Sequence, residues 1–92
     1  MTREEILEQA REGHVVAIST EDLTPLLEHA EAVREDKTSI AGSIRTLRVR
    51  DLVLVQERTP KGDHFIRSVA SVEVAGRFVE ARLAAYERMW DG

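Results

Sequence analysis

The chain has 92 residues, of which 42% are apolar and 33% charged, a balance typical of one folded globular domain rather than of a disordered chain. It contains no cysteine, which excludes disulfide bonds and thiolate metal sites. The net charge of −4 argues against indiscriminate binding to nucleic acids.

The first predicted elements are a helix and a short strand. Thr2 and Glu5 have the spacing of a capping box, which predicts a helix start, and Gly13 is a helix stop. Residues 14–18 are apolar and partly β-branched, which predicts a strand. Residues 19–23 are interpreted as a connection or a single helical turn.

A second helix is expected from Thr24-Pro25. The hydroxyl of Thr24 is a suitable cap, and proline is favoured at the first helical position. Apolar residues then recur at helical spacing as far as Val33. The polar residues 34–37 are expected to end this helix.

A third helix is predicted over residues 38–50. Ile40, Ile44 and Leu47 lie at i, i+4 and i+7, so one face of such a helix is apolar. Residues 45–57 also alternate with a period of two, which would give one long strand instead. The register of the two isoleucines with Leu47 favours the helix.

A β-hairpin and a long helix complete the chain. Residues 52–57 and 64–70 have the composition of strands, and the connection contains Pro60 and Gly62, which suit a turn. From Ser71 to about residue 90, a wide apolar stripe at helical spacing predicts a long helix.

The segment 38–53 resembles the recognition helix and first wing strand of winged-helix regulators of the MarR and PadR type. The pattern is carried by a small polar residue, three apolar residues at helical spacing and the start of a strand: Ser39, Ile40, Ile44, Leu47 and Asp51-Leu52-Val53. Asp51 stands where the family usually has glycine.

This resemblance implies an α+β fold of the winged helix-turn-helix type, with three helices, a β-hairpin wing and a long C-terminal helix. Residues 1–70 would form the winged-helix domain, and residues 71–92 the helix that such proteins often use to dimerise. The implied function is sequence-specific binding of double-stranded DNA by a dimeric transcriptional regulator. Helix 38–50 would enter the major groove, and the hairpin 52–70 would contact the flanking backbone.

The distribution of charge supports one basic face on an acidic chain. Residues 1–36 hold three basic and ten acidic side chains, a net of −7, whereas residues 37–67 hold seven basic and three acidic side chains, a net of +4. A polyanion could therefore be bound on one side only. The candidate DNA contacts are small, polar or basic: Thr38, Ser39, Gly42, Ser43, Arg45, Thr46, Arg48, Arg50, Arg58, Lys61 and His64.

Alternatives remain for these residues. The arginines of 45–50 could equally be solvated or paired with acidic side chains, and Ser39 and Ser43 could be helix caps. The competing hypothesis is a winged-helix module for protein–protein interaction that does not bind DNA. A continuous basic face would favour DNA, and pairing of the arginines with Glu28, Glu31 or Glu35 would favour the interaction module.

The stripe on the last helix is wider than the core of a monomer needs, which predicts a homodimer. Its interface residues would be Phe78, Val79, Leu83, Tyr86, Met89 and Trp90. Tyr86 and Trp90 could belong to the core as well as to an interface.

Catalysis, cofactors and metal ions are not expected. The three histidines, His14, His29 and His64, lack the spacing of metal ligands, and neither a nucleophile motif nor a phosphate-binding glycine loop is present. The charged N-terminus is unlike a signal peptide, and the longest apolar runs, such as 52–55, are too short to span a bilayer. A cytoplasmic location without membrane association is therefore expected; a small-molecule effector cannot be identified from the sequence.

Overall fold

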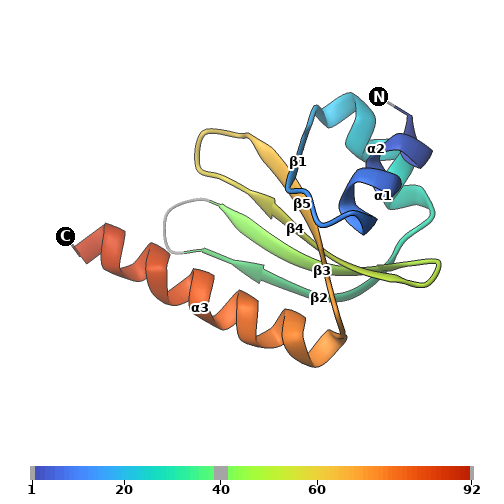
Figure 1. The fold of residues 1–92 in the computed structure, drawn as a ribbon. Coiled ribbons are helices and arrows are strands. Elements are labelled where there is room, and N and C mark those ends of the chain that lie inside the picture. Colours follow the sequence, from blue (N-terminus) through green and yellow to red (C-terminus); the bar gives the residue numbers. More distant parts are fainter. Residues whose placement is uncertain (1, 39–41, 92) are drawn as a thin grey trace.

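A computed structural model of the chain describes residues 2–38 and 42–91, with side chains as far as residue 88. The fold is α+β, with three helices and a five-stranded antiparallel sheet (Figure 1). In chain order the elements are α1 (Arg3–Arg11), β1 (Val16–Ile18), α2 (Thr20–Glu28), β2 (Glu31–Lys37), β3 (Ser43–Val49), β4 (Leu52–Arg58), β5 (His64–Val69) and α3 (Val72–Asp91).

The sheet has the strand order β1-β5-β4-β3-β2. Strands β2 to β5 follow one another as antiparallel neighbours, and β1 joins the sheet at β5, so β1 and β2 are the two edges. Helices α1 and α2 lie on one face of the sheet and α3 lies on the other (Figure 1). None of the helices in the described residues combines the length and apolar character needed to cross a bilayer.

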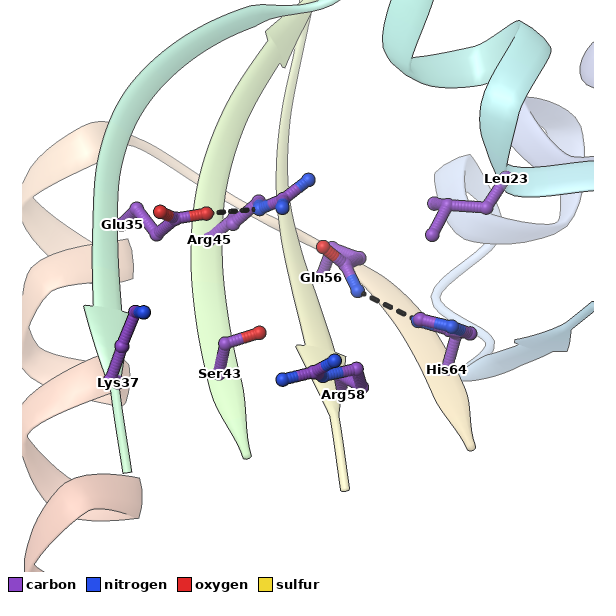
Figure 2. A pocket seen from close by; sticks show the side chains of 8 residues that line it. All are labelled: Leu23, Glu35, Lys37, Ser43, Arg45, Gln56, Arg58 and His64. Atoms are coloured by element: carbon purple, nitrogen blue, oxygen red, sulfur yellow. Dashed lines mark hydrogen bonds and ion pairs between the residues drawn. The ribbon is translucent and has the colours of Figure 1, made fainter. Parts of the chain in front are cut away.

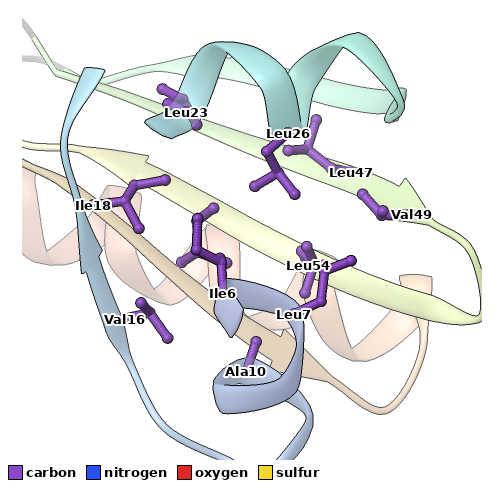
Figure 3. Packing of buried hydrophobic residues seen from close by; sticks show 11 residues of the cluster. Ile6, Leu7, Ala10, Val16, Ile18, Leu23, Leu26, Leu47, Val49 and Leu54 are labelled. Atoms are coloured by element: carbon purple, nitrogen blue, oxygen red, sulfur yellow. The ribbon is translucent and has the colours of Figure 1, made fainter. Parts of the chain in front are cut away.

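The core between the sheet and the first two helices is built mainly from aliphatic side chains (Figure 3). It contains Ile6, Leu7, Ala10, Val16, Ile18, Leu23, Leu26, Leu47, Val49, Leu54 and Ile66. These side chains cover the half of the sheet next to the β3–β4 turn and β1. The other half of this face, near the end of β2 and the start of β3, is left without a helical cover.

The core beneath α3 combines apolar packing with a buried ionic group. Ile44 and Val55 pack against Ala75, Val79 and Tyr86 of the helix. Glu57, which is 3% exposed, accepts hydrogen bonds from Arg82 at 2.8 and 3.2 Å and from the hydroxyl of Tyr86. Burial alone raises the pKa of Glu57, but these hydrogen bonds outweigh it and hold the pKa below its ordinary value.

The structure confirms the elements that local signals define. The hydroxyl of Thr2 accepts from the backbone of Glu5 at 3.2 Å, and the reciprocal bond completes the capping box of α1. Strands β4 and β5 form the predicted hairpin, and Gly62 in its turn has a φ of 91°. Helix α3 matches the predicted C-terminal helix to within about one residue at each end.

The helix predicted over 38–50 is wrong. Residues 43–49 form strand β3, in the middle of the sheet, and Ser39 and Ile40 lie outside the described residues. Ile44 faces α3, whereas Leu47 faces α1 and α2. Because both faces of this strand are covered, apolar residues occur on both sides and imitate helical spacing. The alternative of one long strand over 45–57 is also incorrect, since a turn at Arg50-Asp51 divides it into β3 and β4.

The helix predicted from Thr24-Pro25 is also misplaced. Helix α2 begins five residues earlier than Pro25, at Thr20, where the hydroxyl of Ser19 caps it by accepting from the backbone of Asp22. The helix was expected to continue as far as Val33 and to end in the polar residues 34–37. Instead, residues 31–37 form the edge strand β2. Their composition favours helix, but pairing with β3 overrides that preference. Strands therefore separate the helices, and the helix order of a winged helix-turn-helix is not observed.

Candidate functional site

Two rows of polar side chains cross the uncovered half of the sheet. Strand register aligns the first row from β2 to β5 as Lys37, Ser43, Arg58 and His64. Two residues away on each strand, the second row consists of Glu35, Arg45 and Gln56 and ends at the buried apolar Ile66. Because alternate residues of a strand face the same side, both rows lie on the face that carries α1 and α2.

These rows form the floor of a pocket whose cavity volume is about 240 Å³ (Figure 2). Leu23 of α2 forms one wall, and the side chains of Glu35, Lys37, Ser43, Arg45, Gln56, Arg58 and His64 line the rest. We call this cavity the basic pocket. Leu23 is the one residue of α2 in this lining, and the remaining lining residues all belong to strands β2 to β5.

The basic pocket carries a local excess of positive charge. Lys37, Arg45 and Arg58 contribute three cations and Glu35 one carboxylate, so two positive charges are uncompensated. Nε of Arg45 lies 2.5 Å from Oε2 of Glu35. The side chains of Lys37 and Arg58 have no hydrogen-bond or ion-pair partner within residues 2–38 and 42–88.

A chain of hydrogen bonds links the pocket floor to α2. Nε2 of Gln56 lies 3.1 Å from Nδ1 of His64, and Nε2 of His64 lies 3.4 Å from the hydroxyl of Thr20. If Gln56 donates, His64 is neutral with its proton on Nε2. Burial lowers the pKa of His64, and the charges of Arg58 and Arg45 lower it further. The neutral form is therefore favoured when the pocket is empty.

Gln56 also carries an unpaired acceptor. Its side chain is 2% exposed, and Oε1 has no hydrogen-bond partner in the described part of the chain. A buried acceptor without a partner costs about 1–3 kcal/mol, so such atoms call for an explanation. Figure 2 shows the amide of Gln56 between Arg45 and His64, with its nitrogen toward the imidazole.

The connection between β2 and β3 is built tightly against Arg58. The backbone of Gly42 donates to the hydroxyl of Thr38 at 2.7 Å, which closes the loop ends together. A β-carbon on Gly42 would lie 2.7 Å from the carbonyl oxygen of Arg58. Only glycine therefore allows this close approach, and it fixes the backbone of Arg58 at the pocket edge.

The structure gathers four of the predicted DNA contacts in the basic pocket: Ser43, Arg45, Arg58 and His64. The others do not join them. Thr46 is buried on the face toward α3, and Arg48 alternates onto that same face, where it is exposed. Lys61 lies in the exposed β4–β5 turn.

Of the four remaining predicted contacts, three have structural roles and one lies outside the described residues. Arg50, at the β3–β4 turn, forms hydrogen bonds with the carboxylate of Glu4. Thr38 and Gly42 close the β2–β3 loop, and Ser39 lies outside the described residues. The pairing of Arg45 with Glu35 is the arrangement that favours an interaction module over a continuous DNA-reading face.

Sequence reasoning missed Lys37, Glu35, Gln56 and Thr20 as site residues. Residues 31–37 carry no clear strand signal, because their polar and apolar side chains do not alternate with a period of two. No sequence signal marks Gln56, because its role depends on which strand lies beside it. Within the described residues, no three histidine, aspartate or glutamate side chains lie close enough together to hold a metal ion.

The residues proposed for dimerisation lie largely against the chain's own sheet. Val79 and Tyr86 are 0% and 4% exposed, and Phe78 and Leu83 are partly buried beside them. The side chains of Met89 and Trp90 are outside the described part. The width of the apolar stripe thus has an intramolecular explanation, and a homodimer stays a prediction.

Comparison of the chain with protein-family models, with curated proteins and with solved structures finds no match.

Proposed function

We propose that the chain is a binding protein whose basic pocket takes the phosphate group of a small ligand. The observation that carries this proposal is the charge of the pocket: two uncompensated positive charges on a chain whose overall charge is −4. A phosphate monoester carries a charge of about −1.5 to −2 at neutral pH, which matches that excess. Lysine and arginine are also the side chains that phosphate oxygens most often contact.

The two cations that have no partner among the described side chains are the natural primary contacts. Lys37 and Arg58 lie in the same cross-strand row, on either side of Ser43, whose hydroxyl can donate a further hydrogen bond. Arg45 already pairs with Glu35 through Nε, so its two terminal nitrogens remain as donors. The pocket thus offers several donors to one group of oxygen acceptors.

The unpaired oxygen of Gln56 suits a pocket that fills with an anion. A bound phosphate stabilises the protonated form of His64, whose Nδ1 then becomes a donor. Rotation of the Gln56 amide exchanges its nitrogen and oxygen and presents Oε1 to that donor, at the position now 3.1 Å away. The buried acceptor without a partner is then satisfied in the loaded protein.

A titration of the whole chain with inorganic phosphate tests the proposal. Backbone amide NMR signals of β3, β4 and β5 should shift in a saturable way, and Arg58→Gln and Lys37→Gln should each weaken binding by about tenfold, the scale of one charged contact. Arg77→Gln on the exposed side of α3 is the matched control and should bind as the unaltered chain does. No saturable shift, or equal weakening in all three variants, would refute the proposal.

Double-stranded DNA is a second candidate, because the β4–β5 turn carries the exposed Lys61 three residues after Arg58. Without a helix at 43–49, contacts would be to backbone phosphates rather than to bases in the major groove. Lys61→Glu distinguishes the two functions, since Lys61 does not line the basic pocket. It should weaken binding of a labelled duplex at low ionic strength, if such binding exists, and leave phosphate binding unchanged.

A further inference from the structure

A second cavity adjoins the basic pocket on the same face of the sheet. Its volume is about 250 Å³, and it is lined by Leu27, Ala30, Ala32, Glu35, Arg45 and Leu47. Glu35 and Arg45 line both cavities, so their ion pair stands at the boundary between them. We call the second cavity the apolar pocket, because aliphatic side chains form the rest of its lining.

The position of the apolar pocket follows from strand register. Ala32 pairs with Leu47, which in turn pairs with Leu54, and this row lies directly beyond the row of Glu35, Arg45 and Gln56. The bulge between Ala32 and Arg34 keeps Ala32 on the face of Leu47 while Arg34 turns to the other face. On this face of the sheet, the row that contains Arg45 is therefore followed directly by an aliphatic row that contains Leu47.

The apolar pocket has exposed and buried parts. Leu47 is 1% exposed and forms the floor, whereas Leu27 and Ala30 are only partly buried and Ala32 is exposed. When an apolar group of a ligand covers exposed apolar surface, the surface is removed from water and the free energy of the complex is lowered. Each cavity alone is smaller than the roughly 300 Å³ at which ligand sites of ordinary size begin, and the two together reach that range.

We infer that the two pockets form one site for an amphipathic phosphate monoester, with the phosphate in the basic pocket and an aliphatic group of a few carbons in the apolar pocket. This inference rests on the proposed function and names the class of its ligand. The ligand is a free small molecule rather than a lipid within a membrane, because a chain with a charge of −4 is repelled by an anionic bilayer.

The test compares methyl phosphate with butyl phosphate by calorimetry on the whole chain. Each methylene that becomes fully buried raises affinity by up to about fourfold, so butyl phosphate should bind at least about tenfold more tightly. Leu27→Gln and Ala32→Gln should remove this difference and leave the affinity for methyl phosphate unchanged, since neither variant alters charge. Ala84→Gln on the exposed side of α3 is the control and should keep the full difference.

Failure of the inference is distinct from failure of the proposed function. Equal affinities for the two esters, both weakened by Arg58→Gln, would overturn the amphipathic ligand and leave phosphate binding intact. Absence of binding to either ester would overturn both. Co-sedimentation with vesicles of equimolar phosphatidylcholine and phosphatidic acid distinguishes a free small-molecule ligand from a lipid within a membrane. We expect the chain to stay in the supernatant, and binding to the vesicles would overturn the assignment to a free molecule.

Discussion

Gln56 and His64 form a diagonal pair across β4 and β5, with the amide nitrogen 3.1 Å from Nδ1 of the imidazole. Direct cross-strand partners of these residues are Ile66 and Arg58, so the pair joins the two polar rows of the basic pocket. The bond holds the imidazole ring against the floor of the pocket, close to the cations that control its protonation.

The charge of Arg58 is expected to hold down the pKa of His64. Burial is the largest cause of the low pKa, followed by the positive charges of Arg58 and Arg45, while Asp63 acts in the opposite direction. Arg58→Gln should therefore raise the pKa of His64, which an NMR titration of the imidazole Cε1–H measures directly. Arg77→Gln should leave it unchanged. A pKa that did not move on removal of Arg58 would contradict this electrostatic arrangement.

The same shift makes stability depend on pH. Because the folded pKa of His64 lies below its ordinary value of 6.5, the unfolded chain binds the proton more readily. The contribution of His64 to stability is therefore complete above pH 6.5 and decreases as the pH falls toward the folded pKa. Thermal unfolding followed between pH 7 and pH 5 should show this loss, and His64→Gln should reduce it.

Gly42→Ala should destabilise the fold and weaken phosphate binding together. The added β-carbon would meet the carbonyl oxygen of Arg58 at 2.7 Å, and backbone cannot move aside cheaply. We expect a loss of about 1–3 kcal/mol in denaturant unfolding, the usual range for overpacking.

Gly76→Ala is the matched control for Gly42. A β-carbon there would meet nothing closer than Arg34 at 3.9 Å, and Gly76 lies inside helix α3. Alanine should therefore stabilise the chain by about 0.5–1 kcal/mol through its greater helix propensity. If both alanine variants had the same effect, close approach at Gly42 would not be the cause.

The buried carboxylate of Glu57 should stabilise the fold only when it is ionised. Its pKa is lower in the folded chain than its ordinary value of 4.5, so its contribution is complete above pH 4.5 and is lost as the pH falls through the folded pKa. Glu57→Gln should cost about 1–3 kcal/mol at neutral pH, because hydrogen bonds from Arg82 and Tyr86 lose their charged acceptor.

Unfolding curves at neutral and acidic pH check the role of Glu57. The difference between Glu57→Gln and the unaltered chain should shrink below pH 4.5. Glu73→Gln, at the exposed start of α3, should show no comparable change. A constant difference across the pH range would mean that the ionised form is not what stabilises the α3 layer.

The β3–β4 turn offers a test that separates backbone strain from ion pairing. Arg50 has a φ of 55°, a conformation that favours glycine, and its guanidinium pairs with Glu4. Arg50→Ala removes the exposed pair and keeps the unfavourable backbone, so its Tm should fall. Arg50→Gly removes the pair and relieves the backbone, so its Tm should exceed that of Arg50→Ala. The reverse order would show that the turn is not strained.

Local signals predicted the parts of the fold that depend on local physics. The capping box of Thr2 and Glu5 specifies the start of α1, and the turn containing Gly62 specifies the β4–β5 hairpin. A long apolar stripe likewise predicted α3. The signal for each of these features lies within one stretch of chain, so it can be read without knowing which distant residues pack against it.

The basic pocket was predicted only in part. Ser43, Arg45, Arg58 and His64 were selected for their charge and polarity, but they were assigned to a helix and a wing rather than to one sheet. Lys37 and Gln56 were missed, because nothing within a few residues of either indicates which strands lie beside it.

The sequence by itself thus determined the first helix, the hairpin and the last helix, because caps, turns and periodicity act over short distances. Only the tertiary structure decided that 31–37 and 43–49 are strands. Helices cover both faces of 43–49 and so remove the alternation that marks a strand, whereas the exposed segment 31–37 is a strand because it pairs with β3. The same pairing decided the site: register across four strands aligns Lys37, Ser43, Arg58 and His64, which are otherwise far apart along the chain.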